Sequence, residues 1–176
     1  MKLPSARVVR EKLFELLRYG ALGGCVYIIA GQLMRHSSGP KAGAAAAAFD
    51  LPLVGQAGRV SLAAQQGKPV LMEVYASWCG VCKRSSPRLA EAYRDHQHDN
   101  VTFLAVSVDD DPAAAARSKS EWQIPFDVAI DDGSVSRGYG IKMLPTLIYI
   151  DGKGTVRHSA VGSASRSEID DWIAER

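Results

Sequence analysis

From residue 49 onward the chain alternates between continuous apolar runs and amphipathic stretches. Apolar runs occupy 70–76 and 101–108, and such runs are typical of strands that are buried on both faces of a sheet. Between them, residues 80–96 carry apolar positions at helical spacing, which predicts an amphipathic helix. Shorter apolar runs at 126–130 and 146–150 predict further strands. The pattern therefore indicates strands and helices that follow one another along the chain.

Turn and capping signals complete this outline. Pro112 favours the first turn of a second helix, and Asp-Gly-Lys-Gly at 151–154 predicts a hairpin turn. Ser165 and Glu168 have the spacing of a capping box at the start of a last helix. Upstream, residues 49–66 predict an N-terminal hairpin. We expect an α/β domain over 49–176, with a mixed central sheet and helices on both faces.

The N-terminal segment has a different pattern. Residues 16–34 are largely apolar, with Arg18 as their one charged residue, and approach the ~20 residues that a membrane-spanning helix needs. Basic residues are concentrated upstream, so the positive-inside rule predicts a cytoplasmic segment 1–15, a single transmembrane anchor 16–34 and an exported body. Residues 35–48 lack any apolar pattern and are interpreted as a linker.

Three alternatives to an uncleaved anchor remain for this segment. It could be a buried helix of a soluble protein, or a signal peptide cleaved within the small residues near 37–48. The stretch Leu-Gly-Gly-Cys ending at Cys25 also resembles a lipoprotein cleavage site. We favour the anchor, because most of the apolar weight follows Cys25, whereas a lipoprotein signal would have it before the cysteine.

The charge distribution argues against nucleic-acid binding. The net charge is +2, but residues 1–36 hold six basic and two acidic groups, so this segment carries +4 and the remainder −2. The body has no basic stripe with interleaved aromatic residues. We expect no nucleic-acid partner.

Cys79 and Cys82 are the chemically informative pair, and a metal site is the first possibility. A structural zinc site needs about four Cys or His ligands at characteristic spacings. The further candidates are scattered along the chain, and those of the body are interpreted as solvated residues: His36, His96, His98 and His158. We therefore expect no metal site.

Pairing of the two cysteines is the second possibility. On the first turn of a helix, residues three apart have Cα atoms roughly 5 Å apart, within the range of a disulfide. Cys79 would lie at the helix N-terminus, whose positive end favours its thiolate, and Lys83 and Arg84 add positive charge. Cys82, one turn further, could resolve a mixed disulfide with Cys79.

The three consecutive acidic residues at 109–111 are interpreted as a solvated loop and helix cap.

The stretch Glu-Val-Tyr-Ala-Ser-Trp-Cys-Gly-Val-Cys at 73–82 resembles the active-site strand and helix of thioredoxin-fold oxidoreductases. The resemblance implies that Glu73 is buried under the disulfide and relays protons. A carboxyl group in an apolar strand should have a raised pKa, which suits a general base for Cys82. The alternative is a glutamate that faces water at a sheet edge.

The stretch Lys-Met-Leu-Pro-Thr at 142–146 provides a second resemblance. It implies a cis peptide bond before Pro145, opposite the cysteines, and a Leu144 backbone that pairs with a substrate strand. The resemblance at 73–82 implies that Trp78, beside Cys79, contacts the substrate. Gly80 and Val81, between the cysteines, would border the substrate, and they lack the histidine of strong oxidants.

Over residues 49–176 the chain is similar to TlpA/ResA-like membrane-anchored thioredoxins, and also to exported thioredoxins of the suppressor-of-copper-sensitivity type. The resemblance implies a thiol:disulfide oxidoreductase at the inner membrane, with its catalytic domain in the periplasm. It would reduce protein disulfides without a cofactor, and a membrane electron carrier of the thiol-disulfide interchange type would recharge it. Cytochrome c maturation and copper or oxidative stress tolerance are the implied roles. Ser85 departs from the glutamate that members dedicated to cytochrome c maturation often carry.

Two other functions remain as alternatives. A Cu(I) metallochaperone could bind copper through Cys79 and Cys82, since soft thiolates select Cu(I). A thiol peroxidase would share the fold, but it would have a threonine three residues before its reactive cysteine, where this chain has Ala76.

Overall fold

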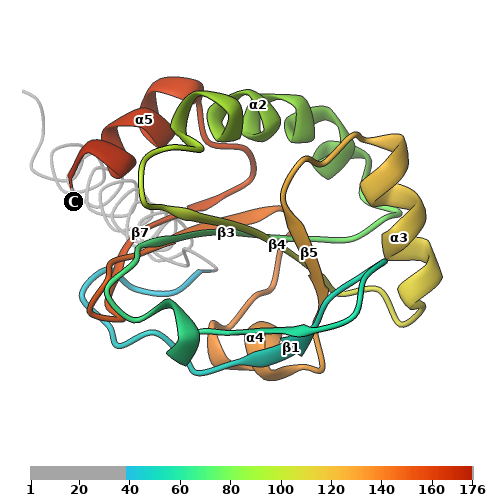
Figure 1. Cartoon of the computed structure of the whole chain (residues 1–176), viewed down its shortest axis with the longest axis horizontal. Coiled ribbons are helices and arrows are strands. Elements are labelled where there is room, and N and C mark those ends of the chain that lie inside the picture. The colour runs from blue at the N-terminus through green and yellow to red at the C-terminus, as the bar shows by residue number, and fades with distance from the viewer. Residues whose placement is uncertain (1–38, 176) are drawn as a thin grey trace, which may run out of the picture. The chain divides into compact units, whose positions relative to one another are not determined.

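The computed structural model describes residues 39–175, which contain a five-stranded mixed sheet with helices on both faces (Figure 1). The sheet has the strand order β5-β4-β3-β6-β7. Its strands are β3 Val70–Tyr75, β4 Thr102–Ser107, β5 Asp127–Ile130, β6 Thr146–Ile150 and β7 Val156–Val161. β3 pairs in parallel with β4 and antiparallel with β6, so the strand that leads to the cysteines is the central one.

The remaining elements surround this sheet. The helices are α2 Gly80–His96, α3 Pro112–Glu121, α4 Ser134–Gly138 and α5 Arg166–Ala174. A separate hairpin of β1 Asp50–Pro52 and β2 Arg59–Ser61 precedes the sheet, with a short 3-10 turn at Ala63–Gln65. The predicted mixed sheet, the hairpin and the helix over 80–96 are confirmed.

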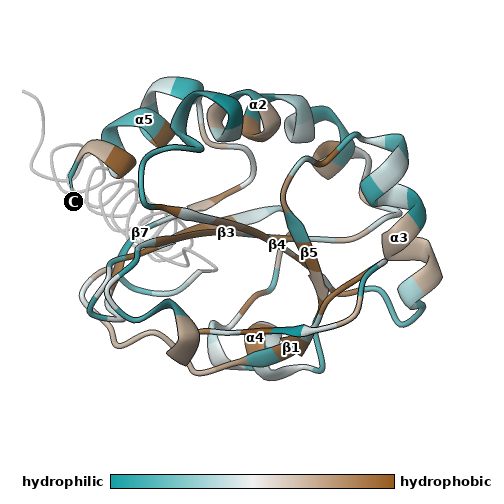
Figure 2. Ribbon diagram, in the orientation of Figure 1, coloured by the Kyte–Doolittle hydropathy of each residue, from teal (hydrophilic) through white to brown (hydrophobic). Residues whose placement is uncertain are grey.

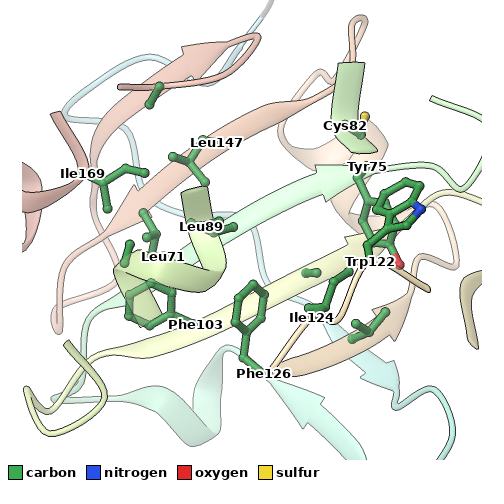
Figure 3. Packing of buried hydrophobic residues seen from close by; sticks show 14 of the residues in the cluster. Leu71, Tyr75, Cys82, Leu89, Phe103, Trp122, Ile124, Phe126, Leu147 and Ile169 are labelled. Atoms are coloured by element: carbon green, nitrogen blue, oxygen red, sulfur yellow. The ribbon is translucent and has the colours of Figure 1, made fainter. Parts of the chain in front are cut away.

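Side chains of β3 alternate between two hydrophobic clusters. Leu71 and Tyr75 face the cluster beneath α2 and α5, whereas Met72 and Val74 face the cluster on the side of α4 and the hairpin. Figure 2 shows the central strands β3 and β4 largely in brown, the hydrophobic end of the scale, and Figure 3 shows Leu71 close to Leu89 of α2. Because both faces are covered, a polar side chain on β3 is withdrawn from water.

Both edges of the sheet are partly covered by neighbouring segments. At β5, the amide of Val54 donates to the carbonyl of Val128 at 2.8 Å. At β7, Gly43 donates to the Val156 carbonyl at 2.8 Å, and the Val156 amide donates to Ala44 at 2.9 Å. Such cover removes unpaired strand edges that could template aggregation.

The segment along β7 differs from the sequence prediction. Residues 39–48 belong to the predicted linker 35–48, yet this part pairs with an edge strand, and Tyr139 donates a hydrogen bond to the Ala47 carbonyl at 2.9 Å. Backbone pairing needs no apolar side chains, so the composition gave no sign of it.

The helix α4 was not predicted; the Asp131 carboxylate accepts hydrogen bonds from the amides of Val135 and Ser136, each at 2.9 Å, and so caps it.

The predicted transmembrane segment 16–34 lies outside the described residues. Among residues 39–175, no helix is long and apolar enough to cross a membrane.

Candidate active site

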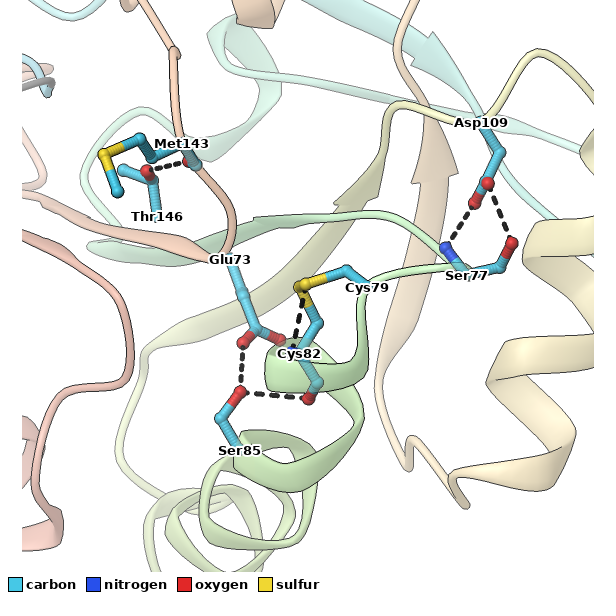
Figure 4. The surroundings of a disulfide bond; sticks show 8 residues. All are labelled: Glu73, Ser77, Cys79, Cys82, Ser85, Asp109, Met143 and Thr146. Carbon is cyan, nitrogen blue, oxygen red and sulfur yellow. Dashed lines mark hydrogen bonds between the residues drawn. A yellow bond between two sulfur atoms is a disulfide. The ribbon is translucent and has the colours of Figure 1, made fainter.

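Cys79 and Cys82 lie where β3 gives way to α2. β3 ends at Tyr75, and Cys79 is the N-cap of α2. Its Sγ is bonded to Sγ of Cys82, with Cα atoms 5.2 Å apart. The Cys79 Sγ also accepts a hydrogen bond from the Cys82 amide at 3.1 Å (Figure 4). In the reduced protein the same amide and the positive end of the helix would stabilise a Cys79 thiolate.

The two sulfurs differ in their access to solvent. Cys79 is 8% exposed and Cys82 is fully buried, whereas the neighbouring Trp78 is 74% exposed. A large apolar side chain that is exposed to solvent beside a reactive sulfur can contact a partner molecule. A partner can therefore approach Cys79 alongside Trp78, but it cannot reach Cys82 directly.

The loop that precedes β6 faces the disulfide. The Leu144–Pro145 peptide bond is cis, as the resemblance implies. The Thr146 hydroxyl donates to the Met143 carbonyl at 2.8 Å, and the Gly162 amide donates to the Pro145 carbonyl at 2.8 Å. These two hydrogen bonds fix the backbone on both sides of Leu144. Within the described part of the chain, the Leu144 amide and carbonyl themselves make no hydrogen bond.

A cleft of about 430 Å³ joins this loop to the cysteine, and its lining is largely apolar. Trp78, Cys79 and Val108 form one side, and residues 141–144 with Ser136 form the other. Met143, which sequence reasoning did not single out, is more than half exposed here. The sequence feature that could have identified Met143 is its position two residues before the cis-proline. The cleft can accept an extended chain with apolar side chains.

Glu73 lies in the middle of β3, on the face that carries the disulfide. The residue is buried, and the Ser85 hydroxyl donates to its Oε1 at 3.3 Å. Burial raises the pKa of Glu73 to about 7, while the hydrogen bond from Ser85 acts in the opposite direction. The alternative of a water-facing glutamate at a sheet edge is wrong, because β3 is central. Figure 4 shows the carboxyl group beside Cys82.

Asp109 holds the turn that leads to Cys79. Its carboxylate accepts hydrogen bonds from the amide and the hydroxyl of Ser77, both at 2.8 Å, and from the Ser107 hydroxyl at 2.6 Å. The interpretation of residues 109–111 as solvated is therefore wrong for Asp109, which is buried. It is correct for Asp111, which is exposed and caps α3. Asp109 follows a buried parallel strand, a position where polar side chains often face the site.

Two histidines of the described segment, His96 and His158, make specific side-chain contacts. His96 lies between the carboxylates of Asp99 and Asp170, at 2.7 and 2.8 Å, so its interpretation as a solvated residue is wrong. His158 bonds to Glu175 at 2.7 Å and stacks on Trp172. Among residues 39–175, no group of three or more His, Cys, Asp or Glu side chains is placed to hold a metal ion.

Comparison with known proteins identifies the family of this chain. The AhpC/TSA family profile matches residues 42–159. The thiol-disulfide oxidoreductase ResA of Geobacillus thermodenitrificans is 29% identical over 165 residues, covering 93% of this chain and 92% of ResA. The thiol:disulfide interchange protein DsbE of Pseudomonas fluorescens is 32% identical over 120 residues, covering 65% of this chain and 64% of DsbE.

The fold supports the same grouping. A crystal structure of a thiol:disulfide interchange protein DsbE from Chlorobium tepidum is 28% identical and superposes with a TM-score of 0.71, covering 77% of this chain and 97% of that one. Together with the Cys79–Cys82 disulfide, these similarities show that the chain belongs to the AhpC/TSA family, as a thioredoxin-fold thiol-disulfide oxidoreductase of the ResA and DsbE type.

Proposed function

We propose that this oxidoreductase is exported, tethered to the inner membrane and works as a reductase of protein disulfides. The observation that carries the reaction is the asymmetry of the pair: Cys79 has surface access and a hydrogen bond from the Cys82 amide, while Cys82 is buried. A nucleophile needs both access and a stabilised thiolate, whereas a resolving thiol needs only to reach its neighbour.

The reaction proceeds in two exchanges. The Cys79 thiolate attacks one sulfur of the substrate disulfide, and a mixed disulfide forms as the first substrate thiolate leaves. Cys82 then loses its proton and attacks Sγ of Cys79, which releases the second substrate thiolate and forms the Cys79–Cys82 bond. The two electrons that reduce the substrate come from the two protein thiols, so the chain needs no bound cofactor for this step.

Glu73 is the proposed acid–base group of the second exchange. Its carboxyl lies beside Cys82, and its pKa of about 7 lets it accept and return a proton near neutral pH. Replacement by glutamine keeps the hydrogen-bonding shape but removes the base. We therefore expect Glu73→Gln to slow the resolving step by about 10²-fold or more, in the range that general-base catalysis supplies.

The cleft beside the cis-proline is the proposed substrate site. Leu144 presents a backbone amide and carbonyl that are free to pair with an extended substrate segment, as in strand addition. Trp78 and Val81 are exposed beside Cys79. Gly80 leaves open space, since a Cβ there would meet, among atoms within 4 Å, the Arg84 side chain alone, at 3.6 Å. A protein cysteine could thus reach Cys79 while its chain runs past Pro145.

Tethering rests on the N-terminal sequence. Residues 16–34 have the length and the flanking charge of a single-pass anchor with its N-terminus in the cytoplasm. The alignment with Geobacillus ResA covers 93% of this chain and so extends into this segment. Labelling of intact cells with a membrane-impermeant maleimide, after reduction, tests the orientation: we expect Cys79 to be labelled without lysis. Labelling only after lysis would contradict export.

A reductase in an oxidising compartment must be recharged, and we propose a membrane electron carrier of the thiol-disulfide interchange type as its donor. Cytochrome c maturation and tolerance of copper or oxidative stress are the proposed roles. A Cys82→Ser variant should accumulate mixed disulfides through Cys79, which would identify the substrates by mass spectrometry. A Cys79→Ser variant is the matched control and should trap none.

The direction of electron flow is tested by the reduction potential. Equilibration of the full-length protein with glutathione should give a reduction potential of about −270 mV, as for reducing thioredoxins. A reduction potential of about −120 mV would make it an oxidant and contradict the proposal. Insulin reduction with dithiothreitol as electron source should depend on both cysteines. Saturable Cu(I) binding without insulin reduction would favour the metallochaperone, and turnover of hydrogen peroxide would favour the peroxidase.

A further inference from the structure

Ser85 occupies a position between the two groups of the resolving step. Its hydroxyl lies 3.0 Å from the carbonyl oxygen of Cys82 and 3.3 Å from Oε1 of Glu73 (Figure 4). Ser85 is itself buried in α2. Among the described residues, this is the one side chain that forms a hydrogen bond with the Glu73 carboxyl group.

A serine hydroxyl has one proton, so it cannot donate to both oxygens at once. When Glu73 is protonated, its own proton can satisfy the contact with Oγ, and Ser85 is free to donate to the Cys82 carbonyl. When Glu73 is ionised, the carboxylate needs a donor, and the Ser85 hydroxyl must turn towards it and release Cys82. The charge of Glu73 is thus linked to the hydrogen bonding of the Cys82 backbone.

A small cavity of about 10 Å³ adjoins the same pair of side chains. This is about the smallest volume that can hold one water molecule. The charged residue at its lining is Arg88, whose Nη1 donates to the Ala164 carbonyl at 2.9 Å. Towards the β7–α5 loop the lining is Gly162, Ser163 and Ala164, which do not titrate. Tyr75, on the same face of β3, is a further titratable neighbour, and the Cys82 thiol titrates beside Glu73 in the reduced protein.

We propose that Ser85 is a positioning residue that sets the charge state of Glu73 and, through it, the pH at which Cys82 attacks the mixed disulfide. The role rests on the proposed function of Glu73 and specifies how this chain controls it. Loss of the hydroxyl removes the donor that favours the carboxylate, so Glu73 should hold its proton to higher pH. The cavity borders both side chains at their point of contact.

The first test measures Glu73 directly in the oxidised full-length protein, purified in detergent. The side-chain carboxyl shift of ¹³C-labelled glutamate, assigned by its loss in Glu73→Gln, reports the pKa. Ser85→Ala should raise this pKa by about one unit, a tenfold change in the ionisation constant. Ser85→Thr keeps the hydroxyl and should restore the wild-type value. Ser86→Ala, a buried serine one position along α2, is the matched control and should leave it unchanged.

The second test follows the resolving step. Reduced protein in which Cys25 is replaced by serine is mixed with 5,5′-dithiobis(2-nitrobenzoate), and the release of the second thionitrobenzoate reports the attack of Cys82 on Cys79. The midpoint of the pH profile should move upward in Ser85→Ala by the same amount as the Glu73 pKa. If Ser85→Ala does not fold, Ser85→Val, which has the shape of threonine but no hydroxyl, should move both values in the same direction relative to Ser85→Thr.

The outcomes separate this inference from the proposed function. An unchanged Glu73 pKa in Ser85→Ala overturns the inference, and so does a shifted pKa with an unshifted release profile. The carboxyl titration needs no substrate and no electron donor. It can therefore succeed even if the chain proves to be an oxidant or to act elsewhere in the cell, and it can fail while insulin reduction stays normal.

Discussion

Asp109, at the end of β4, accepts two hydrogen bonds from Ser77, which stands two residues before the reactive cysteine. The contact joins residues that are 32 positions apart, and both of its distances are 2.8 Å. Because Asp109 is buried, the turn that carries Trp78 and Cys79 is fixed to the rigid sheet and not merely to the helix that follows. The geometry at Cys79 therefore depends on a residue outside the cysteine motif.

Asp109→Ala should loosen this turn and destabilise the domain. The change leaves the amide and hydroxyl of Ser77 without their acceptor, and hydrogen bonds to charged groups contribute about 1.5–3 kcal/mol each. We expect the free energy of unfolding in urea to fall by about 3 kcal/mol and insulin reduction to slow. Asp110→Ala is the control, because that side chain is exposed. Equal effects in the two variants would contradict the anchoring role.

Cys79 should be the more reactive thiol in the reduced protein. Its position at the N-terminus of α2, with the Cys82 amide aimed at its sulfur, favours the thiolate. Iodoacetamide should modify Cys79 of the Cys82→Ser variant with a midpoint below about pH 7.5, compared with about 8.5 for free cysteine. Cys82 of the Cys79→Ser variant should react at least ~10-fold more slowly because it is buried. A midpoint at the free-cysteine value would refute thiolate activation.

Val81→His should make the protein more oxidising. Val81 is exposed between the cysteines, so an imidazolium there would add positive charge close to the Cys79 thiolate and stabilise the reduced form. One pKa unit of such stabilisation corresponds to about 30 mV for this two-electron couple. We expect a rise of that size in glutathione equilibration near pH 6. Val81→Asn, which cannot become cationic, should show no comparable rise, and the effect of histidine should shrink above its pKa.

Local sequence patterns predicted most of the elements of the fold. The apolar runs of β3 and β4 and the stripe of α2 depend on residues that are close in sequence, and these elements lie where they were predicted. Cys79 and Glu73 could be found because a motif of ten residues contains both. The burial of Glu73 followed from the apolar strand around it.

The features that were missed depend on long-range contacts. Aspartate is usually exposed to solvent, and the burial of Asp109 follows from its contact with Ser77, 32 positions away. His96 meets Asp170 across 74 positions, where α2 and α5 come together. The pairing of residues 43–46 with β7 uses backbone atoms alone. None of these contacts leaves a periodic signal in one sequence, because periodicity records which face is buried and not what lies against it.

His96 should make stability pH-dependent at the contact between α2 and α5. Burial by itself lowers the pKa of His96, but the hydrogen bonds that the ring donates to Asp99 and Asp170 and the charges of these carboxylates together outweigh it, so the pKa is raised and the imidazolium is favoured. Its contribution is complete below the unfolded pKa and is lost as pH rises through the folded one. The pair is near the surface, so we expect less than about 1 kcal/mol. His96→Gln should reduce the difference in unfolding free energy between pH 5.5 and 8.5, and an unchanged difference would contradict this role.

Glu73→Gln should stabilise the oxidised protein while it impairs the enzyme. Burial raises the pKa of Glu73 from 4.5 to about 7, so ionisation disfavours the folded state. For a carboxyl group with a raised pKa, stability is highest below its unfolded pKa and falls as pH rises through the folded value. The total loss is about 3 kcal/mol above pH 7. We expect the variant to exceed wild type in unfolding free energy at pH 8.5 by roughly that amount and to match it near pH 4.5, as measured by urea denaturation. Equal stabilities at pH 8.5 would mean that Glu73 is not held as a neutral, buried acid.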